Sequence, residues 1–288
     1  MRKLMIRLLF FLFVVGILMT RTGLGQDYSL VEDLGNGKID WANGLIHVVG
    51  YGAPPQGVSG PQAKLMARGA AKADAYRNAA EVLNGVRVTS QTYVENYVTR
   101  SDEIKIIVEG FVRGARIIRV DQHWDGIIEL TIELPLGGQT GLTTLLNRPE
   151  VTGGSAAGQR VPFGYPESEV TTERTVYTGV LIDARTLKIK PALYPQVFDH
   201  EGYLLYASTL VDMARPGFTT IVAYARSLDL ARKLPRLGAN PLVLAADGAV
   251  PTRDGDQTDL ILGVEAVKAF RALSPEVLQS GAVVFVID

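Results

Sequence analysis

A stretch crowded with glycine and proline constrains the fold of this 288-residue chain most, because it separates two patterned halves. Four prolines and seven glycines fall between residues 135 and 174, and only Leu142–Asn147 could hold a turn of helix. This composition predicts a linker or an exposed arm over residues 137–174. We therefore expect two domains, which the chain length also favours.

The overall composition predicts folded domains and argues against nucleic-acid binding. Hydrophobic residues make up 47% of the chain and charged residues 20%, which is too apolar for a disordered protein. The 29 basic and 30 acidic residues nearly cancel, whereas nucleic-acid-binding domains are usually strongly basic.

Residues 1–25 have the layout of a secretory signal peptide. Arg2, Lys3 and Arg7 precede an apolar run from Leu8 to Met19, and small residues follow at positions 23 and 25. As a helix, residues 4–19 would extend about 24 Å, which is shorter than the roughly 30 Å hydrocarbon core of a bilayer. We expect cleavage before Gln26; an uncleaved anchor is the alternative. Cleavage would leave 25 basic and 30 acidic residues, a net charge of −5.

The chain contains no cysteine. This excludes lipidation at a mature N-terminal cysteine, disulfide bonds, thiolate zinc sites and thiol catalysis. Together with the signal peptide, it predicts an exported protein that is periplasmic or associated with the outer membrane.

The N-terminal half, residues 26–136, predicts a two-layer domain in the order β-α-β-α-β-β. A strand over 45–51 precedes a helix over 61–83. The predicted apolar face of this helix contains several small side chains, which would let the helix pack closely across strands. Its residues are Met66, Gly69, Ala73, Tyr76, Ala80 and Leu83.

The rest of this half predicts one long strand, one helix and a hairpin. Residues 86–97 are rich in β-branched side chains and predict the strand. Ser101 is the expected N-cap of a helix over residues 101–112. Strands over 115–123 and 127–134 should join at Trp124-Asp125-Gly126, because Asp-Gly is a strong hairpin signal.

The C-terminal half, residues 175–288, predicts a second α/β domain, which makes the whole chain α+β. Short apolar runs predict most of its strands, and the final AVVFVID predicts a buried last strand. The expected strands cover residues 176–183, 193–198, 203–207, 241–246, 258–262 and 282–287, with a helix over 265–272.

Part of the N-terminal half resembles a known family. The stretches AKLMARGAAKADAYRNAAEVL (63–83), TYVENYV (92–98), GFVRGARII (110–118) and ELTIELPL (129–136) are similar to the Lpp-twenty family of envelope lipoproteins, and to the flagellar proteins FlgT (N-terminal domain) and FlgP. The resemblance covers roughly residues 45–136. It implies a non-enzymatic component near the outer membrane or flagellar basal body that often self-assembles.

No catalytic or cofactor-binding motif was found, so no cofactor is expected. Gly50-Tyr51-Gly52 begins like a dinucleotide fingerprint, but Pro55 replaces its third glycine. The histidines, His47, His123 and His200, do not have metal-ligand spacing.

Two weaker site candidates involve carboxylates. Asp254, Asp256, Thr258 and Glu265 match positions of a calcium-binding loop, although Asp259 stands where that loop needs glycine, so a plain surface loop is favoured. Asp183 and Arg185 should share one face at a strand end. They could form an ion pair, the favoured interpretation, or recognise a carboxylate.

Lys64, Arg68 and Lys72 form a basic stripe at four-residue spacing on the first helix. A solvated helix face explains the stripe most simply. The alternative is contact with an acidic partner, either another subunit or phosphate groups of an envelope surface. We expected this stripe to lie opposite the packing face.

Two functional hypotheses follow. The first is a scaffold or assembly factor of the envelope that acts by self-association or docking to envelope or flagellar proteins. The second is a periplasmic ligand-binding protein or enzyme with its site in the C-terminal half, which would require a pocket with convergent polar groups.

Overall fold

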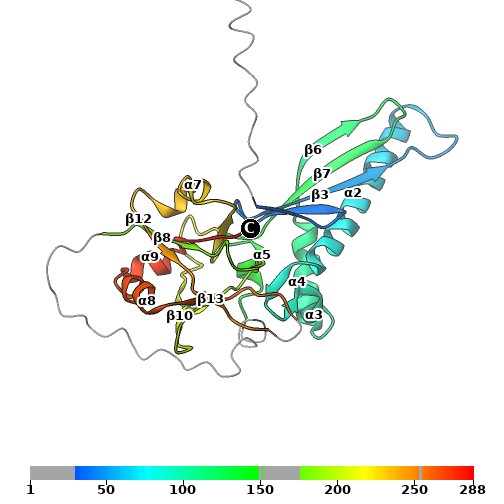
Figure 1. Cartoon of the computed structure of the whole chain (residues 1–288). Helices are drawn as coiled ribbons and strands as arrows, with labels where there is room; N and C mark the ends of the chain where they lie inside the picture. Colours follow the sequence, from blue (N-terminus) through cyan, green and yellow to red (C-terminus); the bar gives the residue numbers. More distant parts are fainter. Residues whose placement is uncertain (1–29, 149–150, 152–175, 253–254) are drawn as a thin grey trace, which may run out of the picture.

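The computed structural model describes residues 30–148, 151, 176–252 and 255–288 and shows an α+β fold with two lobes (Figure 1). The predicted signal peptide and residues 152–174 of the predicted linker lie outside these residues. Within the described part, no helix has both the length and the apolar character needed to cross a membrane.

The N-terminal lobe is built on an antiparallel sheet of five strands in the order β1-β2-β3-β7-β6. The predicted strand over 45–51 and the predicted hairpin are confirmed as β3, β6 and β7, while the first two strands were not predicted. The strands are β1 (Val31–Asp33), β2 (Gly37–Asp40), β3 (Leu45–Gly52), β6 (Arg116–Gln122) and β7 (Ile128–Pro135).

One long helix, α2 (Gly60–Asn84), covers the inner face of this sheet and packs mainly on β3. The predicted helix is confirmed, but the predicted packing face is wrong. An alanine at every fourth position is buried instead, with Val82 and Leu83 at the end of the helix. These alanines are Ala63, Ala67, Ala71, Ala75 and Ala79.

The close contact between α2 and β3 depends on two glycines. A Cβ at Gly50 would lie well inside the van der Waals distance of the Ala75 backbone nitrogen, and one at Gly52 would overlap the Ala67 carbonyl oxygen. Glycine on the strand and alanine on the helix therefore let the two backbones approach directly.

The segment after α2 differs from the single long strand predicted over 86–97. It forms a short hairpin, β4 (Arg87–Thr89) and β5 (Thr92–Tyr93), and then the helix α3 (Val94–Val98). The strand ends because the Asn96 side chain accepts a hydrogen bond from the Tyr93 N–H at 2.7 Å and starts a helix there.

The next helix is confirmed. It is α4 (Asp102–Arg113), and the Ser101 hydroxyl caps it by accepting a hydrogen bond from the Ile104 N–H at 3.3 Å.

The first part of the predicted linker belongs to the core. Residues Leu142–Leu145 form the short helix α5, and Leu142, Leu146 and Val151 are fully buried. Glycines and prolines dominate the composition of this stretch, so its pattern gave no weight to Leu142 and Leu146, which are buried.

The C-terminal lobe contains two four-stranded sheets, which confirms its predicted α/β character. One is entirely parallel, in the order β11-β15-β8-β12, and the other is mixed, in the order β10-β9-β14-β13. The final strand, β15 (Val283–Val286), is buried throughout as predicted. The other strands are β8 (Gly179–Asp183), β9 (Val197–Asp199), β10 (Leu204–Tyr206), β11 (Ala223–Ala225), β12 (Pro241–Ala245), β13 (Gly248–Ala249) and β14 (Leu260–Leu262).

Short helices cover the two faces of the parallel sheet. On one face α7 packs against β11, β15 and β8, and on the other α8 contacts β12 while α9 contacts β8. They are α7 (Leu228–Ala231), α8 (Val264–Arg271) and α9 (Pro275–Gln279), with the 3-10 turns η3 (Ser208–Leu210) and η4 (Pro235–Leu237).

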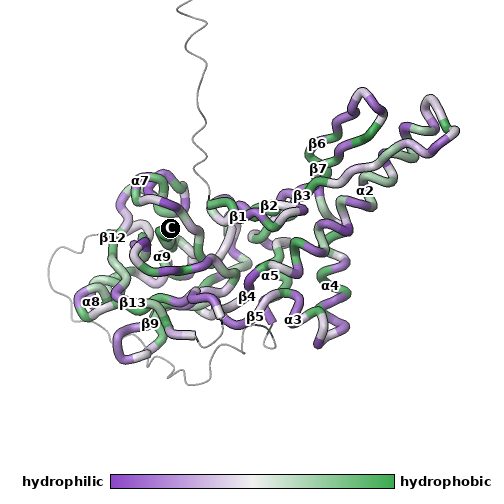
Figure 2. Tube along the Cα trace, turned by 45° about the vertical axis from the view of Figure 1, so that its right-hand side comes forward, coloured by the Kyte–Doolittle hydropathy of each residue, from purple (hydrophilic) through white to green (hydrophobic). Residues whose placement is uncertain are grey.

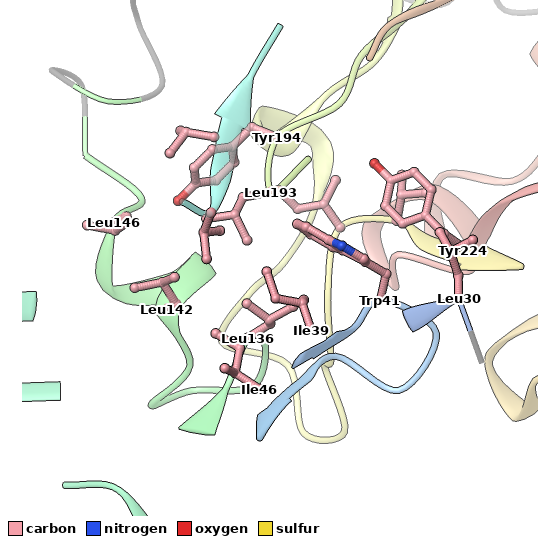
Figure 3. Packing of buried hydrophobic residues seen from close by; sticks show 14 of the residues in the cluster. Leu30, Ile39, Trp41, Ile46, Leu136, Leu142, Leu146, Leu193, Tyr194 and Tyr224 are labelled. Carbon is pink, nitrogen blue, oxygen red and sulfur yellow. The ribbon is translucent and has the colours of Figure 1, made fainter. Parts of the chain in front are cut away.

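One large hydrophobic core runs through both lobes (Figure 3), and a smaller separate cluster lies between the parallel sheet and α7 in the C-terminal lobe. The indole of Trp41 meets the ring of Tyr224 edge-on, with centroids 5.8 Å apart. The Tyr194 hydroxyl donates a 2.5 Å hydrogen bond to the Thr143 carbonyl, and the Leu193 N–H donates to the Arg87 carbonyl at 3.0 Å. The two lobes are therefore packed against each other.

Replacing Gly50 or Gly69 by alanine should change the free energy of unfolding in opposite directions. Gly50→Ala should destabilise the protein by about 1–3 kcal/mol or more, since helix and strand must separate. Gly69→Ala lies on the exposed side of the same helix, where a Cβ meets nothing within 4 Å, and should stabilise by about 0.5–1 kcal/mol. Urea denaturation measures both. Equal effects of the two substitutions would contradict the close-packing account.

Candidate docking surface

An arm made of β6, β7, the end of β3 and the first half of α2 projects from the body of the molecule (Figures 1 and 2). Strand β6 forms the margin of the sheet and is exposed along nearly all its length. Because it pairs only with β7 among the described strands, its outer edge presents backbone groups that no described strand pairs with, which are a template for another strand.

Most exposed large apolar side chains belong to the N-terminal lobe. Eight of the eleven found among the described residues lie there, and three of the eight are in β6. The eight are Tyr51, Leu65, Met66, Ile106, Ile117, Ile118, Val120 and Trp124. Such a concentration on one lobe is typical of an interaction surface.

Side chains cover the part of the β3 edge that β2 leaves without a partner strand. Strand β2 stops beside Val48, and α2 covers the backbone of β3 beyond that point. There the Tyr51 N–H donates to Asp74 at 2.9 Å, and the Asn78 amide donates to the Val49 carbonyl at 2.8 Å. They line a polar groove of about 510 Å³. Among the described residues, no side chain from another element bonds to the outer edge of β6 in this way.

The predicted basic stripe is exposed but is not opposite the packing face. Lys64, Arg68 and Lys72 each follow a buried alanine by one residue, so they flank the contact with the sheet. Within the described residues none of them forms an ion pair, and the Lys72 ammonium lies 5.3 Å from the centre of the Tyr76 ring. The structure therefore leaves all three charges available to solvent or a partner.

The weak calcium candidate is not assembled. Asp256 binds the nearly buried Arg87, with 2.7 Å between Oδ2 and Nη2, and also accepts a hydrogen bond from the Tyr93 hydroxyl. Thr258 is buried, Glu265 pairs with Lys268 on the surface, and Asp254 lies outside the described residues. Asp256 thus joins the two lobes.

Asp183 and Arg185 form the predicted ion pair. The guanidinium donates two hydrogen bonds to the carboxylate, at 2.9 and 2.7 Å, and lowers the pKa of Asp183. The pair lies at the carboxyl end of β8, the edge of a parallel sheet at which ligands commonly bind.

Two of the three histidines are paired with carboxylates on neighbouring strands. His47 lies 3.1 Å from Glu133 and His123 lies 3.2 Å from Glu129. Arg116 lowers the pKa of Glu133, and His47 adds to the effect. No group of metal-ligating side chains is found in the described ranges.

Asp259 was considered only as a defect in the calcium loop, but it is a buried acid. Its Oδ1 accepts hydrogen bonds from the Gln196 N–H at 3.0 Å and the Thr258 hydroxyl at 2.9 Å. Burial raises its pKa to about 6 despite these bonds. The burial of Asp259 could not be predicted from the sequence, because no local pattern distinguishes a buried aspartate from an exposed one.

The shifted pKa predicts how stability depends on pH. Between about pH 4 and 6 the native state holds a proton that the unfolded state has released, so this group's contribution to unfolding free energy falls as pH rises. Asp259→Asn keeps an oxygen acceptor and should flatten that slope, whereas the exposed Glu201→Gln should not. Urea denaturation at a series of pH values tests this. Parallel slopes for wild type and Asp259→Asn would refute it.

Residues 179–288 match the family model for the second domain of Treponema pallidum Tp0624. No curated protein matches the chain. The likeness begins at the first residue of β8 and takes in the whole parallel sheet, so it is the C-terminal lobe that is similar to this Treponema domain.

Proposed function

We propose that this protein is a non-enzymatic, exported component of the cell envelope, a scaffold or assembly factor at the outer membrane or flagellar basal body. It acts by self-association through the open edge of β6. The observation that carries this proposal is that β6 is exposed along nearly all its length and bears apolar side chains.

Strand β6 is self-complementary in an antiparallel pairing. Its residues Arg119, Val120 and Asp121 pair in regular register with β7, so Arg119 and Asp121 share the outer face of the sheet and Val120 lies on the inner face. If a second copy pairs with Val120 opposite Val120, each Arg119 lies opposite the other copy's Asp121. The two faces then offer an apolar pair and two ion pairs, which are favourable cross-strand neighbours.

The same strand carries features that limit uncontrolled pairing. The register shifts at Ile118, which forms a bulge, and Arg119 pairs with Asp121 within the strand. Bulges and charges are the usual means of protecting an edge. They restrict pairing to partners that satisfy the charges, and a second copy does so by exchanging the ion pairs.

Charge-swap variants test the pairing. Asp121→Arg makes both charged positions of this pairing, 119 and 121, basic, and Arg119→Asp makes both acidic. Each variant alone should remain monomeric, because like charges would face each other. The two variants mixed, and the double swap, should both associate. Sedimentation velocity measures this, with Asp229→Arg on the C-terminal lobe as the control. A wild type that stays monomeric at high concentration would defeat self-association.

A second candidate function is ligand binding at the carboxyl edge of the parallel sheet. The topology favours it, since helices cover both faces and the Asp183–Arg185 pair lies at this edge. A small carboxylate ligand would compete with Asp183 for the guanidinium of Arg185. It should raise the melting temperature of the wild type and not of Arg185→Gln; a screen of carboxylates without effect on either would exclude it.

A further inference from the structure

The far end of the arm combines exposed apolar side chains with cations. Trp124 at the tip of the β6–β7 hairpin is 98% exposed, and Leu65 in the second turn of α2 is 70% exposed. The two loops of this end meet, because a Cβ at Gly126 would lie 3.2 Å from the Pro54 ring. Both groups therefore occupy the end of the arm that points away from the body (Figure 1).

The helix side of this end is positively charged, while the hairpin tip carries Asp121 and Asp125. From Gly60 to Ala73 the helix carries Lys64, Arg68 and Lys72 and no acidic residue. A fully exposed tryptophan at the same end of the arm as the cations of α2 has the chemistry of the membrane interface, where the indole lies at the headgroup level and cations meet anionic lipids.

We infer that the end of the arm binds the surface of an anionic lipid bilayer, with Trp124, Leu65 and Met66 in the headgroup region and the basic stripe against lipid phosphates. This inference goes beyond the proposed self-association, which uses the edge of β6.

The observations favour a bilayer over a protein partner. A specific protein interface buries about 800 Å² on each side, whereas the arm end offers Trp124 on a projecting loop and the neighbouring Leu65 and Met66 near a helix start. Two of its three cations are lysines, a residue depleted in protein interfaces. A lipid surface needs no shape complementarity and attracts each cation separately.

Tryptophan fluorescence can report this contact because the chain has only two tryptophans and Trp41 is 2% exposed. Adding vesicles of equal parts phosphatidylcholine and phosphatidylglycerol to the full chain should shift the emission of Trp124 to shorter wavelength. Lipids brominated near the headgroup should quench it. Trp124→Phe should lose the shift and the quenching. All variants keep residues 1–29, so any attachment through that segment is the same in each.

The charge variants separate lipid binding from other contacts. Reversal of Lys64, Arg68 and Lys72 to glutamate should weaken the vesicle-induced shift by more than about tenfold in lipid concentration. Reversal of the exposed Lys188, Lys190 and Arg232 on the other lobe should not. No lipid-induced shift, an equal shift with phosphatidylcholine alone, or a shift that rises with protein concentration without lipid would overturn the inference. The last result would indicate a protein contact at the tip.

Discussion

The direct contact of α2 with β3 determines what the N-terminal lobe leaves exposed. Gly50 and Gly52 have no side chains to hold the helix away, and the alanines of α2 fill the little space that remains. A helix lying this close covers the strand beneath it and part of β7, but it leaves β6 exposed. The open edge comes from the place of β6 at the margin of the sheet, and this packing arrangement leaves Ile117 and Val120 uncovered there.

The second lobe gives the arm a fixed base. Arg87 is the first residue of β4, shortly after α2. It contacts Asp256, the Pro191 carbonyl at 2.8 Å and the face of the Tyr93 ring. Removing the partners of such a nearly buried guanidinium would lower the free energy of unfolding. These contacts therefore also fix the position of the hairpin β4–β5. The shared core around Trp41 and Tyr224 then makes the two lobes one packed body (Figure 3).

Much of the secondary structure could be predicted from local pattern. The strand at 45–51, the first helix, the Ser101 cap and the hairpin at Asp125-Gly126 all carry short-range signals that tertiary packing does not override. The packing face of α2 could not be predicted in this way. Alanine occurs around much of this helix, so hydrophobicity does not distinguish Ala73, which is exposed, from Ala71, which is buried.

What sequence reasoning missed depends on partners distant in the chain. Asp256 meets Arg87 across 169 positions, and the Thr143 carbonyl, next to Leu142, accepts a hydrogen bond from the Tyr194 hydroxyl in the other lobe. The apolar spacing of Leu142 and Leu146 was a signal for a core helix, but the surrounding glycines and prolines outweighed it. The exposure of β6 carried no local signal either, because its alternating side chains are those of an ordinary sheet strand.

Strand β6 should be open in the isolated chain and paired in the assembled protein. Amide hydrogen exchange over residues 116–122 measures this directly, in dilute purified protein and in the assembled state captured from the envelope. The account predicts that the amides directed away from β7 exchange fast in the dilute protein and become strongly protected on assembly, while the amides of β15 are protected in both. Exchange over β6 that is equally fast in both states would contradict it.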